Sequence, residues 1–184
     1  MNDALLLAAF VAAVNPLRVR PGMPWREPGR RDTAHLAAAA VGVLALAAAG
    51  AAVADPLLDG LDISPESFRI AAGLVVAVVG AWVIVFPARG EEPVLAGWGA
   101  ALVPLAFPLL ITPEVTVLVL SAGADEGAGA VTAGMAVGLA LTVAAGFVRR
   151  TPLATSLLRA GSRLLGALLV VAGIQLIIDG IRDV

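Results

Sequence analysis

Four apolar stretches of this chain are each long enough to cross a lipid bilayer as a helix. A spanning helix needs about 20 predominantly apolar residues, with about 17 as a lower bound. The four stretches cover residues 36–54, 70–88, 94–112 and 127–148. Two further stretches are marginal: 164–178 can be completed by tilting and arginine snorkelling, whereas 4–14 ends at Asn15-Pro16. The pattern predicts an all-α integral membrane protein with six membrane-spanning segments.

The composition agrees with this class. Hydrophobic residues make up 60% of the 184 residues, charged residues 14%, and the mean hydropathy is +0.97. Soluble domains average about 45–50% apolar and about 25% charged residues. The chain has no cysteine, which excludes disulfides and thiol chemistry. The opening residues resemble a signal peptide but carry Asp3 and no positive charge, so we expect them to stay in the mature protein.

The distribution of arginines predicts the orientation, because short cytoplasmic loops collect positive charge. All twelve basic residues are arginine. Ten fall in or beside the loops after the first, third and fifth segments: Arg18, Arg20, Arg26, Arg30, Arg31, Arg89, Arg149, Arg150, Arg159 and Arg163. The other side has only Arg69 and Arg182, beside Asp55, Asp59, Asp62, Glu66, Asp125, Glu126 and Asp183. We therefore expect both termini to lie outside.

Prolines and glycines recur in the same order in the two halves of the chain. Asn15-Pro16 recurs as Thr112-Pro113, and two pairs of segments supply matching glycines: Gly42 and Gly50 with Gly138 and Gly146, and Gly73 and Gly80 with Gly166 and Gly173. A unit with three crossings must be inverted in its second copy. We therefore predict two inverted three-helix repeats within one membrane domain, 1–92 and 93–184, with helices one and four broken at proline.

The two proline breaks are the first candidate site. Proline removes a backbone donor and frees carbonyls, which cannot stay unsatisfied against lipid. A break at this depth therefore faces protein, a wet cavity or an ion. On this interpretation Asn15, Pro16, Thr112 and Pro113 line a central site. The alternative interpretation is a packing kink, or the end of a short helix.

Arg18 and Glu114 follow the two breaks at nearly equivalent repeat positions and carry opposite charges. Charges inside a membrane usually pair or face water. We therefore expect Arg18 and Glu114 to meet at the repeat interface and to form or gate the site. In the alternative, Arg18 lies at the cytoplasmic boundary and Glu114 lies elsewhere in solvent. Arg20 is expected to hold its loop on the cytoplasmic side.

Gln175 and Asp179 share one face of the sixth segment, four residues apart. They could bind substrate or carry a proton, although such an aspartate more often marks a helix end. Arg69 is interpreted as a boundary anchor that can pair with Glu66. The candidate substrate- or ion-binding set is therefore Asn15, Pro16, Arg18, Thr112, Pro113, Glu114, Thr116 and Gln175, with Glu114 and Asp179 as candidate proton carriers.

Two ridges of small residues are expected to pack helices closely. The first is Gly134, Gly138, Thr142 and Gly146, and the second is Gly73, Ala77 and Ala81. Such ridges fit the inside of one chain or the face of a homodimer equally well, and both uses stay open here.

Four ordered motifs resemble the MarC family of six-helix bacterial inner-membrane proteins, itself similar to the LysE transporter superfamily. They are VNPLRVRP, ISPESFRIAAGLVVAVVGAWVIVFP, LVPLAFPLLITPEVT and GIQLIIDGI, spread over nearly the whole chain. The resemblance implies two inverted repeats in a multi-pass inner-membrane protein with both termini facing the periplasm or exterior. It does not imply a substrate.

The chain departs from the family pattern at both breaks. Family members usually have glycine where this chain has Arg18, and Gly-Pro-Gly where it has Thr112-Pro113-Glu114. Both departures replace a small residue by a charged one, which makes Arg18 and Glu114 the places to look for specificity.

Several functional classes lack the residues they need. A single histidine and no cysteine leave no metal cluster, and no glycine-rich phosphate loop is present, so no metal or other cofactor is expected. The serines lack a histidine partner for nucleophilic catalysis, so we expect no enzyme. The arginine-rich loops suit contact with anionic membrane lipids, and nucleic-acid binding has no support.

These features favour a secondary transporter or exporter of a small metabolite or amphiphile, with its site between the two broken helices. The coupling ion would be H+ or Na+, unless the flow is simply downhill. The alternative is a non-transporting membrane subunit that binds a partner protein or anionic lipid. A continuous polar cavity that reaches Asn15 and Thr112 would favour transport.

Overall fold

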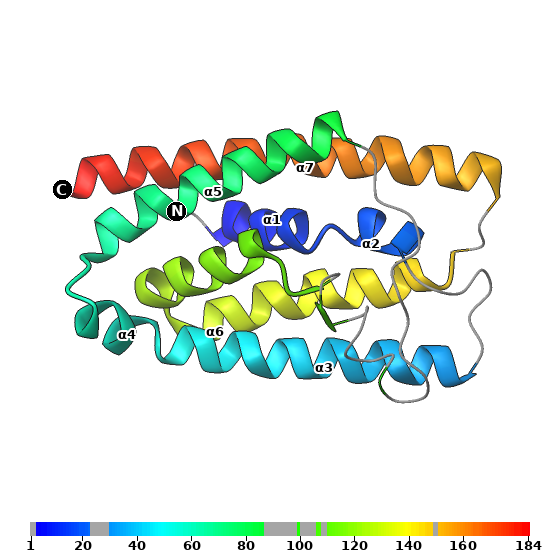
Figure 1. The fold of residues 1–184 in the computed structure, drawn as a ribbon, viewed down its shortest axis with the longest axis horizontal. Coiled ribbons are helices and arrows are strands. Elements are labelled where there is room, and N and C mark those ends of the chain that lie inside the picture. Colours follow the sequence, from blue (N-terminus) through cyan, green and yellow to red (C-terminus); the bar gives the residue numbers. More distant parts are fainter. Residues whose placement is uncertain (1–2, 23–29, 87–98, 100–105, 108–109, 149–150) are drawn as a thin grey trace.

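The computed structural model describes residues 3–22, 30–86, 99, 106–107, 110–148 and 151–184, and these are mostly helical with no strand among them. The helices are α1 (Asp3–Val14), α2 (Pro16–Gly22), α3 (Arg30–Ala52), α4 (Ala54–Gly60), α5 (Pro65–Val85), α6 (Pro113–Gly146) and α7 (Pro152–Asp183). They lie roughly side by side in one elongated bundle (Figure 1). The predicted all-α class is confirmed. Most of the predicted segment 94–112 lies outside the described residues.

Within the described ranges, four helices are long and apolar enough to cross a membrane: Asp32–Ala52 of α3, and α5, α6 and α7. The helix α6 is a hairpin rather than one rod, because Gly127 has φ 82° and ψ 166° and reverses the chain direction (Figure 1). Only glycine adopts this conformation without strain. The residues before and after Gly127 therefore form two antiparallel segments.

Three of the long helices begin with the same dipeptide pattern, a hydroxyl residue followed by proline. These starts are Ser64-Pro65, Thr112-Pro113 and Thr151-Pro152. The Ser64 and Thr151 side chains accept hydrogen bonds from the backbone N–H groups of Ser67 and Ala154. Proline at the first helical position needs no hydrogen-bond acceptor, and the hydroxyl caps an otherwise unpaired donor. Thr112 makes no such cap.

Glycines bring α5 and α7 into backbone contact along an antiparallel crossing. A Cβ atom added to Gly73 would lie 2.6 Å from the carbonyl oxygen of Gly173, and one added to Gly80 would lie 2.8 Å from that of Gly166. Side chains are excluded here, so the two helices approach closely and gain dispersion contacts. The ridge on α6 is also used inside the chain, since Gly134 packs on Phe10 and Gly138 on Val14.

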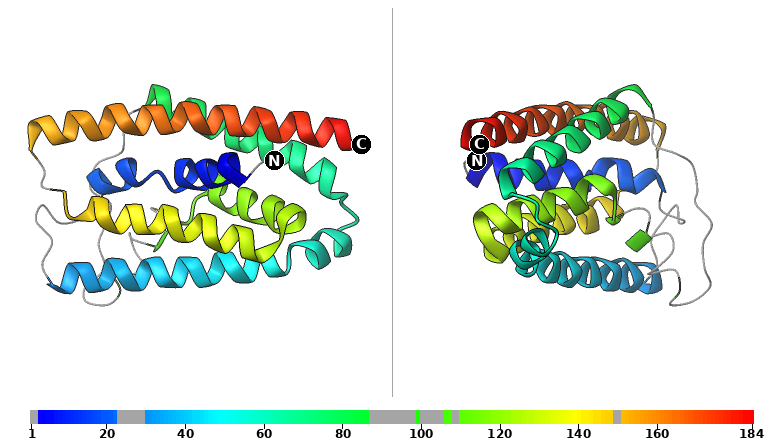
Figure 2. Two further views of the ribbon diagram at one scale, coloured as in Figure 1. Left: turned by 180° about the vertical axis from the view of Figure 1, so that it is seen from behind. Right: turned by 60° about the vertical axis from the view of Figure 1, so that its left-hand side comes forward.

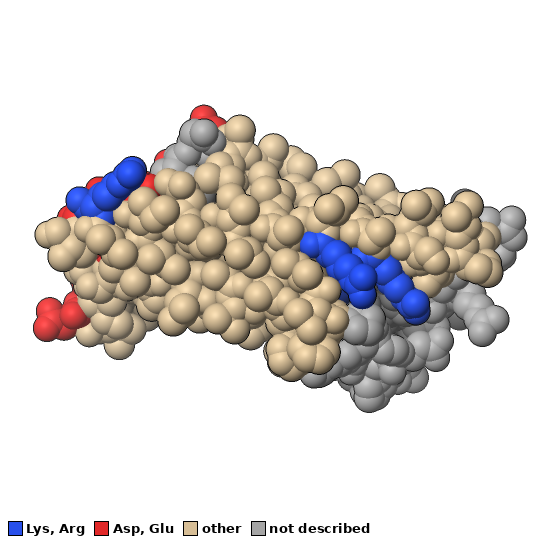
Figure 3. Space-filling model, turned by 90° about the horizontal axis from the view of Figure 1, so that it is seen from above, with Lys and Arg blue, Asp and Glu red and all other residues tan. Residues whose placement is uncertain are grey.

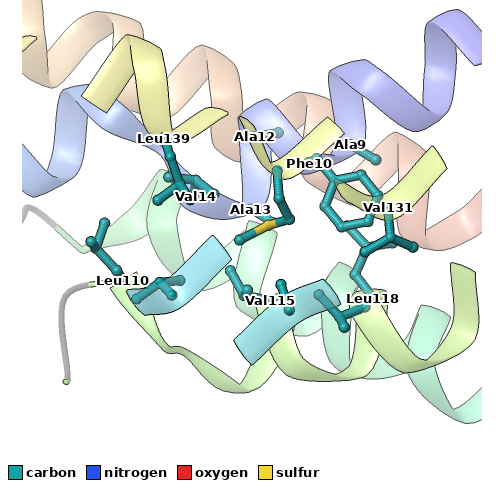
Figure 4. Packing of buried hydrophobic residues seen from close by; sticks show 14 of the residues in the cluster. Ala9, Phe10, Ala12, Ala13, Val14, Leu110, Val115, Leu118, Val131 and Leu139 are labelled. Carbon is teal, nitrogen blue, oxygen red and sulfur yellow. The ribbon is translucent and has the colours of Figure 1, made fainter. Parts of the chain in front are cut away.

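The short helix α1 lies in the middle of the bundle, between the α5–α7 pair and the α3–α6 layer (Figure 2). Its Phe10 is fully buried and packs in one cluster with residues of α5, α6 and α7, including Val76, Leu118 and Ala172. Figure 4 shows Phe10 beside Leu118 and Val131 in this core. The centre of the molecule is therefore apolar and densely filled.

Charges separate along the bundle. The acidic end holds α4, the start of α5, the bend of α6 and the end of α7, with Asp55, Asp59, Asp62, Glu66, Asp125, Glu126, Asp179 and Asp183. On the face shown in Figure 3, acidic side chains gather at this end. The basic end holds α2, the start of α3, the end of α6 and the start of α7, with Arg18, Arg20, Arg159 and Arg163. The N-terminal end of α1 and the C-terminal end of α7 both point toward the acidic end (Figure 1). Which side of the membrane this end faces stays a prediction.

Candidate functional site

The first candidate residue, Asn15, separates α1 from α2 and has φ 44°. Asparagine tolerates this left-handed conformation better than most side chains. Its side-chain oxygen accepts a hydrogen bond from the N–H of Arg18 at 3.1 Å, and its amide donates to the carbonyl of Ser162 on α7 at 3.3 Å. Asn15 is only 4% exposed, yet its side chain has partners on both sides. Asn15 therefore caps α2 and ties it to α7.

The second candidate residue, Thr112, is extended at φ −122° and ψ 159° and precedes Pro113, the first residue of α6. Its carbonyl accepts from both the N–H and the hydroxyl of Thr116, each at 3.0 Å. Its own hydroxyl is buried, caps no helix and interacts with the side chain of Glu114. The Thr112 hydroxyl therefore lies beside a carboxylate, whereas the Asn15 side chain holds backbone groups. Whether either site breaks one membrane-spanning helix stays a prediction, since most of 94–112 is not described.

Glu114 is a buried carboxylate in the first turn of α6, with 4% exposure. Carboxylates are favoured at helix N-termini, where backbone N–H groups are unpaired. Its electrostatic neighbours include Thr112 and the guanidinium of Arg18, which is half-buried. The structure thus brings Arg18, Thr112 and Glu114 into one electrostatic group. Arg18 and Glu114 form no ion pair among the contacts described for them, so their attraction acts over a longer distance.

Gln175 and Asp179 lie apart from this group. Gln175 donates to a carboxylate oxygen of Asp179 at 2.7 Å. Asn15 contacts α7 at Ser162, and Asp179 is about 25 Å further along the same helix axis at 1.5 Å per residue. The predicted site residues therefore belong to two separate places, the breaks and the acidic end. Thr116 is exposed and lines neither of them.

A cavity of about 170 Å³ lies at the acidic end, where α1, α5, α6 and α7 meet. It is lined by Leu6, Arg69, Ala122, Asp125, Glu126, Leu176, Asp179 and Asp183. A second, apolar cavity of about 390 Å³ lies between α3 and α6 and includes Thr116. Neither of these two cavities is lined by Asn15 or Thr112, so neither is the polar path to the breaks that transport would use.

Arg69 has partners that the sequence analysis missed. Its Nε and Nη2 atoms donate to the two carboxylate oxygens of Asp125 at 2.7 and 2.5 Å, and its Nη1 donates to Asp183. The expected partner, Glu66, lies one turn away on the same helix, but α6 and α7 supply carboxylates that accept the planar guanidinium at both edges. The signal in the sequence was a single arginine, Arg69, among many acidic residues near the start of α5.

Arg20 is fully buried, at 0% exposure, rather than a loop anchor. Its Nε and Nη2 atoms donate to the carbonyl of Val148 at 2.9 and 2.8 Å. Val148 directly follows the end of α6, where carbonyls have no helical partners and the helix dipole favours a cation. Arg20 therefore lies in a helix and not in a loop, because α2 folds against the end of α6, a contact that periodicity cannot reveal. Its part in holding the basic end on the cytoplasmic side stays a prediction.

Apolar helices of this length around a buried apolar core define an integral membrane protein. The chain belongs to the MarC family: the family model described as MarC family integral membrane protein matches residues 6–184. The resemblance inferred from the four motifs is therefore confirmed. Searches of curated proteins and of solved structures found no match.

Proposed function

We propose that this MarC family protein is a multi-pass secondary transporter or exporter of the cytoplasmic membrane, built from inverted three-helix repeats at 1–92 and 93–184. The observation that carries the proposal is the α5–α7 contact. The repeat pairs Gly73 with Gly166 and Gly80 with Gly173 in sequence. In space Gly73 packs on Gly173 and Gly80 on Gly166, so each glycine touches the counterpart of the other. A two-fold axis between inverted repeats produces this exchange of partners.

The two proposed repeats also approach each other at their breaks. Arg18 belongs to the first repeat, Glu114 to the second, and an electrostatic attraction links them. Buried charges in membrane proteins commonly mark substrate or ion pathways. Glu114 is the candidate proton carrier of this pathway, and the buried hydroxyl of Thr112 is available to a solute or a water.

The filled core between the acidic-end cavity and the breaks then corresponds to a closed state. Phe10 and Leu118 are both fully buried there. Alternating access requires that such a barrier opens, here by movement of the other helices relative to the α5–α7 pair that joins the two repeats. The substrate class is a small metabolite or amphiphile, driven by H+ or Na+ or by its own gradient. Both termini would lie outside and the basic end would face the cytoplasm.

The test is solute uptake into proteoliposomes over a panel of labelled amino acids, organic acids and amphiphilic amines, under imposed proton and sodium gradients. Glu114→Gln, which removes a charge, and Asn15→Gly, which removes two neutral hydrogen bonds, are each expected to lower the initial rate about tenfold. The Asn15→Gly variant keeps the positive φ. Arg182→Gln, at an exposed arginine, is the matched control. Equal rates for wild type and both site variants would reject the site.

A non-transporting subunit that holds anionic lipid or a partner protein is the second candidate. Arg159 and Arg163 favour it, because both are exposed one turn apart on α7. Basic side chains stand out on the face shown in Figure 3. If this function holds, Arg159→Gln with Arg163→Gln removes co-purifying anionic lipid while no solute in the panel is transported by wild type.

A further inference from the structure

Arg69 joins three helices at the acidic end. It projects from the first turns of α5 to Asp125 of α6 and Asp183 of α7. The Asp125 contact is bidentate, and the two side chains are only 13% and 17% exposed, whereas that of Asp183 is 55% exposed. Bidentate arginine–carboxylate pairs have defined geometry and charge-assisted hydrogen bonds, which makes them stronger than ordinary surface pairs.

Arg69 forms the charged rim of the cavity at this end. Leu6, Ala122 and Leu176 also line the cavity and are only 4%, 3% and 3% exposed. Arg69 is the single cation among the described lining residues, against four carboxylates. Loss of its charge would leave those carboxylates to repel one another across the junction of the helices.

The two partners of Arg69 are not equivalent. Near Arg69, a Cβ atom on Gly180 of α7 would lie 2.9 Å from the carbonyl oxygen of Glu66 and 2.7 Å from Ile70. The helices α5 and α7 therefore touch through their backbones about one turn from Asp183, and we expect this pair to move as a unit. Asp125 belongs instead to the hairpin of α6, two residues before the Gly127 bend. The Arg69–Asp125 contact is thus the bond between the rigid pair and the hairpin.

We propose that Arg69 and Asp125 form an ionic latch that closes the acidic-end cavity. Separation of this pair lets the α6 hairpin move away from α5 and α7 and opens the apolar floor to solution. Asp183 keeps the guanidinium oriented within the rigid pair. The proposal that this latch gates a solute path rests on the proposed transport function. The proposal that it closes the cavity does not depend on transport.

The natural absence of cysteine provides the test. Ala122→Cys places one thiol on the cavity floor of the full-length protein, and a charged maleimide measures its accessibility in lipid nanodiscs. Adding Asp125→Asn or Arg69→Gln is expected to speed labelling about tenfold, the order of one lost charge-assisted pair. Adding Asp183→Asn should change it less than about threefold, because α5 and α7 stay packed.

Arg182→Gln, at an exposed arginine near the same end, is the control and should label at the starting rate. The latch is rejected if Asp125→Asn labels no faster than this control. It is also rejected in this form if Asp183→Asn opens the cavity as far as Asp125→Asn. If a single variant elutes as unfolded protein, the charge-swapped double variant Arg69→Asp with Asp125→Arg is labelled instead. Slow labelling of the thiol in this double variant supports the latch. Fast labelling or unfolding overturns it.

Labelling uses no transported solute, so the two proposals fail separately. A protein that transports a panel solute but keeps its cavity closed in Asp125→Asn has no such latch. A protein whose cavity opens in Asp125→Asn but moves no solute retains the latch and loses the transport function.

Discussion

The α5–α7 pair and the region of α1, α2 and α6 lie in the same bundle but are held together by different interactions. The pair is joined by glycines at backbone distance. The other region contains the buried polar residues Asn15, Arg20 and Glu114 and the buried hydroxyl of Thr112. Close apolar packing gives rigidity at no cost in polar desolvation, whereas buried polar groups are costly unless satisfied. The α5–α7 pair therefore forms a rigid structural frame, and the polar region of α1, α2 and α6 is where a functional site can lie.

The largest effect is expected for a side chain placed between α5 and α7. Gly173→Leu inserts atoms where even a Cβ would lie 2.6 Å from the carbonyl oxygen of Gly73. The free energy of unfolding in detergent should fall by about 3 kcal/mol or more. Gly42→Leu on α3 is the matched control, because nothing lies within 4 Å of its added Cβ. Equal melting curves for the two variants would mean that α5 and α7 do not form a rigid frame.

The next effect belongs to the polar region. Arg20→Met keeps much of the apolar stem but removes both hydrogen bonds to the Val148 carbonyl. We expect a loss of about 2 kcal/mol in unfolding free energy, because two charge-assisted hydrogen bonds from a fully buried side chain are lost. Arg20→Lys should recover only part of this loss, since an ammonium group lacks the planar fork. Arg163→Met, at an exposed arginine, should change stability by less than about 0.5 kcal/mol.

The properties that could be predicted from sequence are those set along one helix. Apolar length and composition suffice for the all-α class and, with the motifs, for the MarC family. The local break at Asn15 follows from chemistry that is also local: asparagine tolerates positive φ, and proline suits the first position of a helix.

Contacts between helices could not be predicted in this way. Arg20, expected in a loop, is fully buried against the end of α6, and Arg69 binds carboxylates of α6 and α7 rather than Glu66. Periodicity places a residue on a face of its own helix, but it does not say which helix lies opposite. For the same reason Asp179, grouped with the breaks as a candidate, lies in a separate cavity.

A smaller effect separates backbone strain from hydrogen bonding at Asn15. Asn15→Gly removes the cap on α2 and the contact with Ser162 but keeps the positive φ. Asn15→Ala removes the same groups and adds a Cβ penalty, so it should be less stable than Asn15→Gly by about 1 kcal/mol. Melting temperatures of the two variants in the same detergent give this difference. If alanine is the more stable of the two, the left-handed conformation is not required there.

The smallest effect on stability is expected at Thr112, where it distinguishes function from packing. Thr151→Val removes a hydroxyl that caps α7 through Ala154 and should cost about 1 kcal/mol. Thr112→Val removes a buried hydroxyl that caps no helix and lies beside the Glu114 carboxylate, so stability should change less than in Thr151→Val. Both threonines precede a proline at the start of a long helix. Unfolding measurements on the two variants therefore compare a hydroxyl that caps its helix with one that does not.

The same pair of variants then tests what the Thr112 hydroxyl is for. A buried polar group that adds nothing to stability points to a role in binding. Transport of the solute found for wild type should therefore fall in Thr112→Val and persist in Thr151→Val, the reverse of their order in stability. If Thr112→Val is destabilised as much as Thr151→Val, its hydroxyl has a structural partner and the second break is a capped helix start like the other two.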